Sequence, residues 1–202
     1  MVVKVGILGI QGDFDKHRKL LDDLQTESIV VRYESELSSI DGLIIPGGES
    51  TTLTHIIRRT KLMEPLKLFA EQKPVFGTCA GLIMMAKSVD DYRIEPLGIL
   101  DISVSRNAYG RQVFSFSETI ELSDIGKQSF ATGTFIRAPR IKSLGTTVEI
   151  LAHYHGEPVA VQEGAHIGLS FHPELDNELY FHKMFLAECE SKINFTDKSN
   201  VA

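Results

Sequence analysis

The chain contains few cysteines, and they have no paired spacing. Its only two cysteines, Cys79 and Cys189, lie far apart in a sequence of 202 residues. They therefore form neither a metal-ligand pair nor a dithiol redox motif. So few cysteines also exclude a disulfide-rich secreted scaffold. We expect no metal site, and we expect the protein in a reducing, cytoplasmic environment.

Long apolar runs and positive charge are scarce as well. No segment approaches the roughly 20 apolar residues that a membrane helix needs. Residues 1–10 hold one basic residue and no cleavage site, unlike a signal peptide. The 21 Lys and Arg residues against 27 Asp and Glu give a net charge of −6, with no dense basic cluster. These absences argue against a membrane or a nucleic acid as partner.

The remaining composition is that of an ordinary globular protein, with 43% hydrophobic and 24% charged residues. The length fits one domain. We expect a single domain over residues 1–193, followed by a polar tail, residues 194–202, that frays.

The first half of the chain alternates between strand and helix patterns. Apolar runs predict strands at residues 2–10, 29–31, 43–45 and 74–76. Helical spacing or capping residues predict helices at residues 13–24, after Glu49-Ser50-Thr51-Thr52, at 62–71 and at 82–87. This rhythm is typical of an α/β fold, with a mostly parallel sheet and helices on both faces.

The second half follows a different pattern. Short strand candidates occur at residues 100–104, 112–116, 118–122, 133–136, 147–152, 158–162 and 166–171. Gly and Pro separate them, and no helix pattern lies between them. We expect an antiparallel extension of the sheet, closed by a final helix at residues 177–191.

One pentapeptide, Gly77-Thr78-Cys79-Ala80-Gly81, has the form of a strand-to-helix elbow. In such an elbow the flanking glycines let the backbone turn sharply, and the central nucleophile is held at the tip in a strained conformation. Here the central residue is a cysteine. At a helix N-terminus, Cys79 would lie where unpaired N–H groups and the helix dipole stabilise a thiolate.

A base for this nucleophile follows the last predicted strand, in Ser170-Phe171-His172-Pro173-Glu174. His172 would then stand at the same sheet edge as Cys79, which is where open α/β sheets bind ligands. The predicted roles are nucleophile for Cys79, proton carrier for His172, and a carboxylate that orients the imidazole for Glu174.

An acyl-transfer enzyme also needs an oxyanion hole. The N–H of Ala80, directly after the nucleophile, is one predicted donor. The loop Pro46-Gly47-Gly48-Glu49-Ser50 ends another predicted strand and can bring the N–H of Gly48 close to a substrate.

Each motif alone has a simpler reading. A Gly-x-Cys-x-Gly segment is often a structural turn, His-Pro-Glu a surface turn, and Pro-Gly-Gly a loop. Their occurrence together, each after a predicted strand, favours the catalytic interpretation. We expect solvated or core roles for the other histidines, including His17, and a core role for Cys189.

Six motifs extend the pattern along the chain. They are Gly9-Ile10-Gln11-Gly12, Pro46-Gly47-Gly48-Glu49-Ser50-Thr51-Thr52, Phe76-Gly77-Thr78-Cys79-Ala80-Gly81-Leu82, Arg106-Asn107-Ala108-Tyr109-Gly110-Arg111-Gln112, Phe135-Ile136-Arg137-Ala138-Pro139 and Ser170-Phe171-His172-Pro173-Glu174-Leu175. The set resembles the class I, triad-type glutamine amidotransferases. More specifically, it resembles the glutaminase subunit of the ribose 5-phosphate-dependent pyridoxal 5′-phosphate synthase.

The resemblance implies a three-layer fold and a reaction without a cofactor. Glutamine would be hydrolysed to glutamate and ammonia through a γ-glutamyl thioester on Cys79. A synthase subunit would activate the glutaminase and use the ammonia to make pyridoxal 5′-phosphate, which is vitamin B6 biosynthesis. Family analogy places the glutamine against Gly48, Glu49, Ser50, Arg106, Ile136 and Arg137.

Charge complementarity agrees with that placement. A guanidinium suits the α-carboxylate of glutamine, and Glu49 or main-chain carbonyls suit its α-ammonium. We also predict that Gln11 couples partner binding to a reorientation of the Gly47-Gly48 peptide, because Gln11 follows the first strand in a Gly-rich turn. Lys16 precedes His17 where the family often has Glu, which would alter local charge if that helix meets the synthase.

Three alternatives stay open at this point. The chain could be the glutaminase of another biosynthetic complex, such as that of the histidine pathway. It could be a catalytically silent regulatory module of the same fold, although the intact triad argues against this. It could also be a cysteine hydrolase of peptides or γ-glutamyl chains, which would need an open cleft.

Overall fold

The computed structural model describes residues 2–106, 115–123 and 129–199. Within these residues, two sheets carry the fold. In order across the large sheet, the strands are β2 (Glu27–Val31), β1 (Lys4–Leu8), β3 (Gly42–Ile45), β4 (Val75–Thr78), β12 (His166–Leu169), β11 (Glu157–Glu163), β10 (Glu149–Tyr154), β7 (Phe116–Leu122) and β8 (Phe130–Phe135). The small sheet contains β5 (Ala86–Val89), β6 (Leu100–Ser105) and β9 (Arg140–Leu144).

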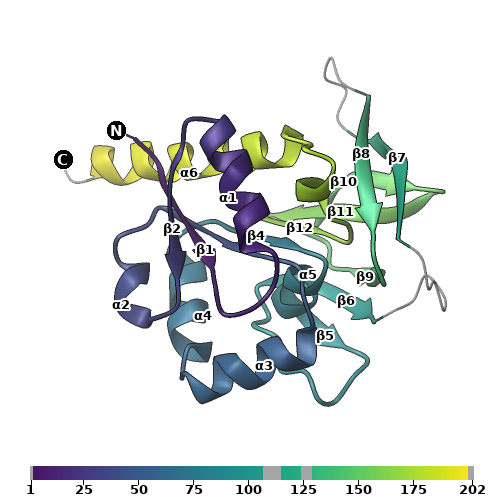
Figure 1. Ribbon diagram of the computed structural model, residues 1–202, viewed down its shortest axis with the longest axis horizontal. Helices are drawn as coiled ribbons and strands as arrows, with labels where there is room; N and C mark the ends of the chain where they lie inside the picture. The colour runs from purple at the N-terminus through teal and green to yellow at the C-terminus, as the bar shows by residue number, and fades with distance from the viewer. Residues whose placement is uncertain (1, 107–114, 124–128, 200–202) are drawn as a thin grey trace.

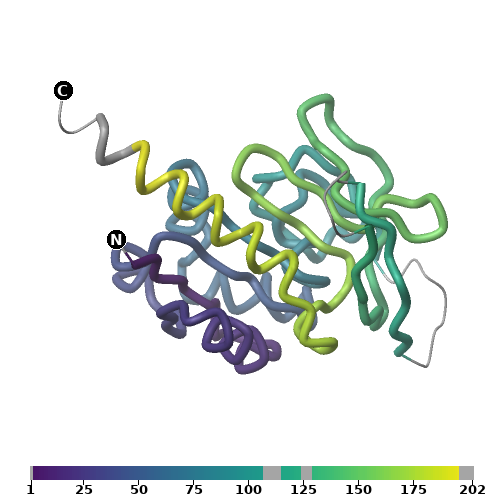
Figure 2. Tube along the Cα trace, turned by 90° about the horizontal axis from the view of Figure 1, so that it is seen from above, coloured from purple at the N-terminus to yellow at the C-terminus, as the bar shows by residue number. Residues whose placement is uncertain are grey.

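The helices connect and cover these strands. They are α1 (Phe14–Asp23), α2 (Glu34–Leu37), α3 (Ser50–Arg59), α4 (Met63–Gln72), α5 (Ala80–Met85) and α6 (Tyr180–Ser199), with a 3₁₀ turn η1 (Pro173–Leu175). The strands from β2 to β12 are parallel, and those from β11 to β8 are antiparallel. In both views the antiparallel part stands at one end of the molecule (Figures 1 and 2).

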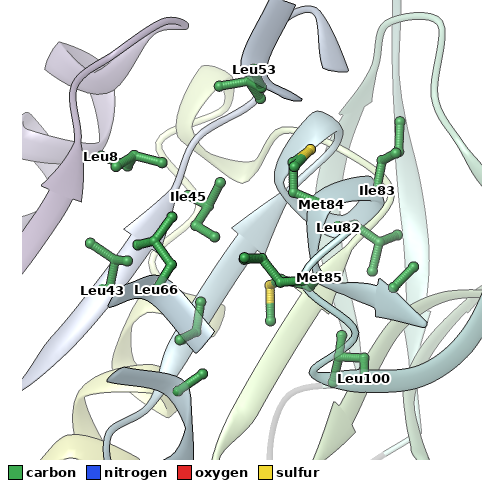
Figure 3. Packing of buried hydrophobic residues seen from close by; sticks show 14 of the residues in the cluster. Leu8, Leu43, Ile45, Leu53, Leu66, Leu82, Ile83, Met84, Met85 and Leu100 are labelled. Carbon is green, nitrogen blue, oxygen red and sulfur yellow. The ribbon is translucent and has the colours of Figure 1, made fainter. Parts of the chain in front are cut away.

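The large sheet has a hydrophobic core on each face. Successive side chains of a strand point to opposite faces, so Leu43 and Ile45 of β3 join one cluster while Ile44 joins the other. The first cluster contains residues of α2, α3, α4 and α5, and Figure 3 shows its packing. The second contains residues of α1 and α6. The predicted α/β fold, with a mostly parallel sheet between helices, is confirmed.

Several elements differ from the sequence-based expectations. The strand β6 belongs to the separate small sheet rather than to the extension of the large one. Residues 86–87, predicted as the end of a helix, instead begin β5, because α5 stops at Met85 and the chain pairs with β6. The short elements α2 and β9 were not predicted. The strand candidate at 112–116 lies largely outside the described residues.

The C-terminal helix is longer than its pattern predicts. The sequence places its end at residue 191, but α6 continues to Ser199 and so includes most of the expected polar tail. No helix formed by the described residues is long and apolar enough to cross a membrane.

The topology brings three chain segments to one edge. The strands β3, β4 and β12 are parallel neighbours, so their carboxyl ends meet at the same edge of the sheet. The loop beginning at Pro46 follows β3, Cys79 follows β4, and Ser170 follows β12. The segments that carry the predicted chemistry are therefore adjacent.

Candidate active site

The backbone at Cys79 has the strained geometry of an elbow. Cys79 has φ 49° and ψ −101° and directly precedes α5, a region that non-glycine residues rarely occupy. The positive φ belongs to Cys79 itself, and neither Gly77 nor Gly81 has one. They are needed for close approach instead: a Cβ on Gly77 would lie 2.7 Å from the carbonyl carbon of Gly81, and one on Gly81 would overlap the main-chain oxygen of Ile45.

The three predicted triad residues lie together. Nδ1 of His172 is 2.7 Å from Oε1 of Glu174, and Cys79 is close enough to raise the pKa of the imidazole. The thiol also lies 3.8 Å from the main-chain oxygen of Ile136. Glu174 is 3% exposed, so its negative charge acts through a medium that screens it poorly.

The charge on His172 follows from this arrangement. Burial, the largest effect, lowers its pKa, but the hydrogen bonds and charges of Cys79 and Glu174 outweigh burial and raise the pKa to about 10. Burial also opposes ionisation of Glu174, yet His17 and His172 lower the pKa of its carboxyl to about 2. At neutral pH the pair is thus an imidazolium beside a carboxylate.

The Gly47-Gly48 loop packs against this triad. A Cβ on Gly47 would lie 2.9 Å from Nδ1 of His172 and closer still to Cε1, so only glycine lets the loop approach the imidazole. The N–H of Gly47 donates to Oγ1 of Thr78 at 3.1 Å. With its amide oriented to satisfy both atoms, Gln11 donates to the main-chain oxygen of Glu49 (2.9 Å) and accepts from its N–H (3.1 Å).

The carboxylate of Glu49 is already engaged. It accepts hydrogen bonds from the backbone and hydroxyl groups of Thr51 and Thr52, which caps α3, and it pairs with Nη2 of Arg106 at 2.9 Å. Although burial opposes ionisation, these hydrogen bonds lower the pKa of Glu49 to about 2. The other arm of Arg106 pairs with Asp91 at 2.6 Å. Asp91 has no motif that would have predicted this role.

A cavity of about 170 Å³ opens at the elbow. The described residues that line it are Gly48, Glu49, Ser50, Cys79, Ala80, Ile83, Arg106, Ile136, Arg137 and His172. The structure thus brings together nearly all of the predicted site. The exceptions are Glu174, which is hydrogen-bonded to His172 but does not line the cavity, and Gln11, which is hydrogen-bonded to the main chain of Glu49.

One lining residue was missed, and one motif cannot be placed. Ile83 is the lining residue that the sequence did not predict; its position one helical turn after Cys79 is the signal that could have found it. The motif following Arg106, residues 107–112, lies outside the described part of the chain. Among the described residues, no cluster of His, Cys, Asp or Glu could hold a metal ion.

Residues 7–191 match the model of the SNO glutamine amidotransferase family. The chain belongs to this family. It is similar to two proteins named pyridoxal 5′-phosphate synthase subunit PdxT. With that of Thermotoga neapolitana it shares 48% identity over 185 residues, which is 91% of this chain and 98% of the relative. With that of Oenococcus oeni it shares 45% over 186 residues, or 92% and 96%.

Solved structures agree with the SNO family assignment. A crystal structure of a glutamine amidotransferase superposes with a TM-score of 0.86 at 40% identity and covers 92% of this chain and 98% of its own. The structure of PurLQS from Thermotoga maritima, at 15% identity, has a TM-score of 0.70 over 93% of this chain and 99% of its own, and it shows the shared fold alone. The predictions of family, fold and enzyme class are confirmed.

Proposed function

We propose that this chain hydrolyses L-glutamine as the glutaminase subunit of a pyridoxal 5′-phosphate synthase. The observation that carries the proposal is the triad at the elbow, which faces a cavity lined by two arginines. The names of the relatives support the destination of the ammonia, which is the synthase subunit of vitamin B6 biosynthesis.

In the proposed reaction, the thiolate sulfur of Cys79, paired with the imidazolium of His172, attacks the carboxamide carbon of glutamine. His172, protonated at neutral pH because its pKa is about 10, passes its proton to the amide nitrogen. Ammonia leaves, and a γ-glutamyl thioester remains on Cys79. His172 then takes a proton from water, the hydroxide attacks the thioester carbonyl, and glutamate departs as the thiolate of Cys79 and the imidazolium of His172 are restored. Glu174 holds the imidazole throughout.

Each tetrahedral intermediate carries a negative oxygen. We place this oxygen between the N–H of Ala80, which begins α5, and the N–H of Gly48. The first N–H groups of a helix have no partner within the helix, so Ala80 can donate to the substrate. Removing one such donor typically costs about 10²- to 10³-fold in rate.

The cavity favours a free amino acid over a polymer. At about 170 Å³ it suits one small molecule better than a peptide or a γ-glutamyl chain. Arg106 and Arg137 are the candidates for the α-carboxylate. The carboxylate of Glu49 is occupied by α3 and Arg106, so we assign the α-ammonium chiefly to main-chain carbonyls, with Glu49 holding Arg106 in place.

We further propose that Gln11 transmits partner binding to the oxyanion loop. Its amide is hydrogen-bonded to both the N–H and the main-chain oxygen of Glu49. A movement of Gln11 would therefore displace the adjoining Gly48 peptide. Gln11→Ala should lower glutamate release in the presence of the synthase subunit. Unchanged stimulation by the synthase would contradict this role.

The decisive experiment compares two cysteine variants, each measured with and without the synthase subunit. Cys79→Ser should abolish glutamate release and glutamine-dependent pyridoxal 5′-phosphate formation, while formation from added ammonium continues. Cys189→Ala is the matched control, because Cys189 is a residue of α6 that is fully buried in the core, and it should keep glutaminase activity. Glutamate release by Cys79→Ser at the wild-type rate would refute the nucleophile assignment.

Two further expectations belong to this proposal. We propose that residues 1–193 form one amidotransferase domain, to which the end of α6 adds a helical extension. We also propose a cytoplasmic location, on the scarcity of cysteine.

A further inference from the structure

Two histidines meet beneath the elbow and take no part in the reaction described above. His17 of α1 and His182 of α6 are both fully buried. Nδ1 of His17 lies 3.0 Å from Nε2 of His182, and both rings pack edge-on against Phe76 of β4. A buried polar pair is costly to retain unless its hydrogen bonds are made.

The second nitrogen of His17 faces the triad. Its Nε2 lies 3.5 Å from Oε2 of Glu174 and 3.2 Å from Oγ1 of Thr78. Oε2 is the carboxylate oxygen that His172 does not use, and it is buried without a hydrogen-bond partner among the described residues. Nε2 of His17 is thus placed to supply the missing polar contact.

The position of the protons follows from charge. If His17 carried its proton on Nδ1, the lone pair of Nε2 would face a buried carboxylate, and Oε2 would have no donor at all. With the proton on Nε2, the N–H points toward Glu174 and Thr78, and Nδ1 accepts from Nε2–H of His182. The second arrangement removes a repulsion and an unsatisfied anion.

The network also reaches the oxyanion loop. Oγ1 of Thr78 contacts Nε2 of His17 and accepts the N–H of Gly47. His17 therefore touches, directly or through one hydroxyl, both the carboxylate that orients His172 and the peptide that precedes Gly48.

We propose that His17, held by His182, is a positioning residue that supplies the N–H facing the second oxygen of Glu174 and, through Thr78, anchors the Gly47 peptide. The role rests on the proposed function, because it concerns the same triad.

Burial favours the neutral form of His17. Burial, the largest effect, lowers its pKa, Glu174 and Asp13 raise it, and His172 lowers it further. Burial and His17 lower the pKa of His182 to about 3. A neutral imidazole can orient the carboxylate without cancelling the charge that His172 needs.

The test uses two amide substitutions of similar polarity. His17→Gln places its amide nitrogen near the position of Nε2 and keeps a donor toward Glu174. His17→Asn reaches only the position of Nδ1 and leaves Oε2 without a donor. Each variant, in complex with the synthase subunit, is assayed for glutamate release from about pH 6 to about pH 10.

The expected results separate the two variants. His17→Asn should lose about 10- to 100-fold in kcat with little change in KM, since a donor to a buried carboxylate is lost. Its high-pH limb should move down by about one pH unit, because a misplaced Glu174 supports the imidazolium less well. His17→Gln should stay within about threefold of wild type. Equal losses in both variants, or an effect on KM alone, would overturn the proposal.

A second readout does not depend on glutamine. In a Cys189→Ala background Cys79 is the only thiol, and its alkylation by iodoacetamide reports on the charge of His172. Because the pKa of His172 is about 10 and should fall by about one unit, His17→Asn should slow alkylation between about pH 9 and about pH 10, and His17→Gln should not. If wild type released no glutamate but these alkylation rates differed as expected, the proposed function would fail while the positioning role of His17 would stand.

Discussion

Adding one methyl group to the oxyanion loop at Gly47 should disable the triad without replacing any triad residue. In Gly47→Ala the new Cβ would lie 2.9 Å from Nδ1 of His172 and closer to Cε1, whereas ordinary contacts begin near 3.4 Å. Because Cε1 is the closest atom, the imidazole must retreat by roughly 1 Å to reach ordinary contact distance. Such a shift weakens either its 2.7 Å hydrogen bond with Glu174 or its alignment with Cys79.

The size of the loss follows from the bond that is broken. A hydrogen bond between charged partners contributes about 1.5–3 kcal/mol, which corresponds to about 10- to 150-fold in kcat. Overpacking adds about 1–3 kcal/mol of destabilisation, so activity is measured well below the unfolding temperature. The assay is glutamate release in the presence of the synthase subunit, with the pKa of His172 followed by NMR.

The neighbouring glycine provides the comparison. In Gly48→Ala the nearest atom to the new Cβ is Cδ of Gln11 at 3.4 Å, so the imidazole has no reason to move. Gly47→Ala should therefore lower the pKa of His172 from about 10, and Gly48→Ala should not, whatever each does to substrate binding. A Gly47→Ala protein with wild-type kcat and an unchanged His172 titration would refute the steric reasoning.

Three further outcomes are expected. Gly81→Ala should lower the free energy of unfolding by about 1–3 kcal/mol in urea titrations, because its methyl group would overlap the main-chain oxygen of Ile45; an unchanged midpoint would contradict this packing. The pKa of His172 rises from 6.5 to about 10 on folding, so its stabilisation is complete below about pH 6.5 and disappears as the pH rises through about 10; His172→Asn should flatten that dependence in denaturation curves. Glu49→Ala should cost about 1 kcal/mol of stability as a lost helix cap and raise KM for glutamine by releasing Arg106, and a KM equal to wild type would speak against that link.

The parallel half of the fold could be predicted because its signals are local and strong. Buried parallel strands are continuous apolar runs, and Gly and capping residues mark their ends. The small sheet could not be predicted, because Ala86 and Lys87 fit a helix as well as a strand. Pairing with β6, a tertiary contact, decides between the two.

The residues of the candidate active site also fall into those that the sequence could predict and those that it could not. Cys79, His172 and the Gly47-Gly48 loop stand in motifs whose chemistry is readable from residue type and order. Asp91 and Ile83 have no such motif, and the burial of His17 against Glu174 requires α1 and η1 to meet across 150 residues of chain. Sequence could place His17 in a core, but only the assembled fold shows which oxygen it faces.

The last strand of the chain, β12, lies in the middle of the large sheet, between β4 and β11. During synthesis Cys79 therefore leaves the ribosome long before the chain contains His172 or Glu174. Until β12 pairs with β4, the thiol of Cys79 has neither His172 nor Glu174 beside it. Strand pairing between distant parts of the chain forms late. The nascent protein thus carries a cysteine that gains its triad partners only when the sheet is complete.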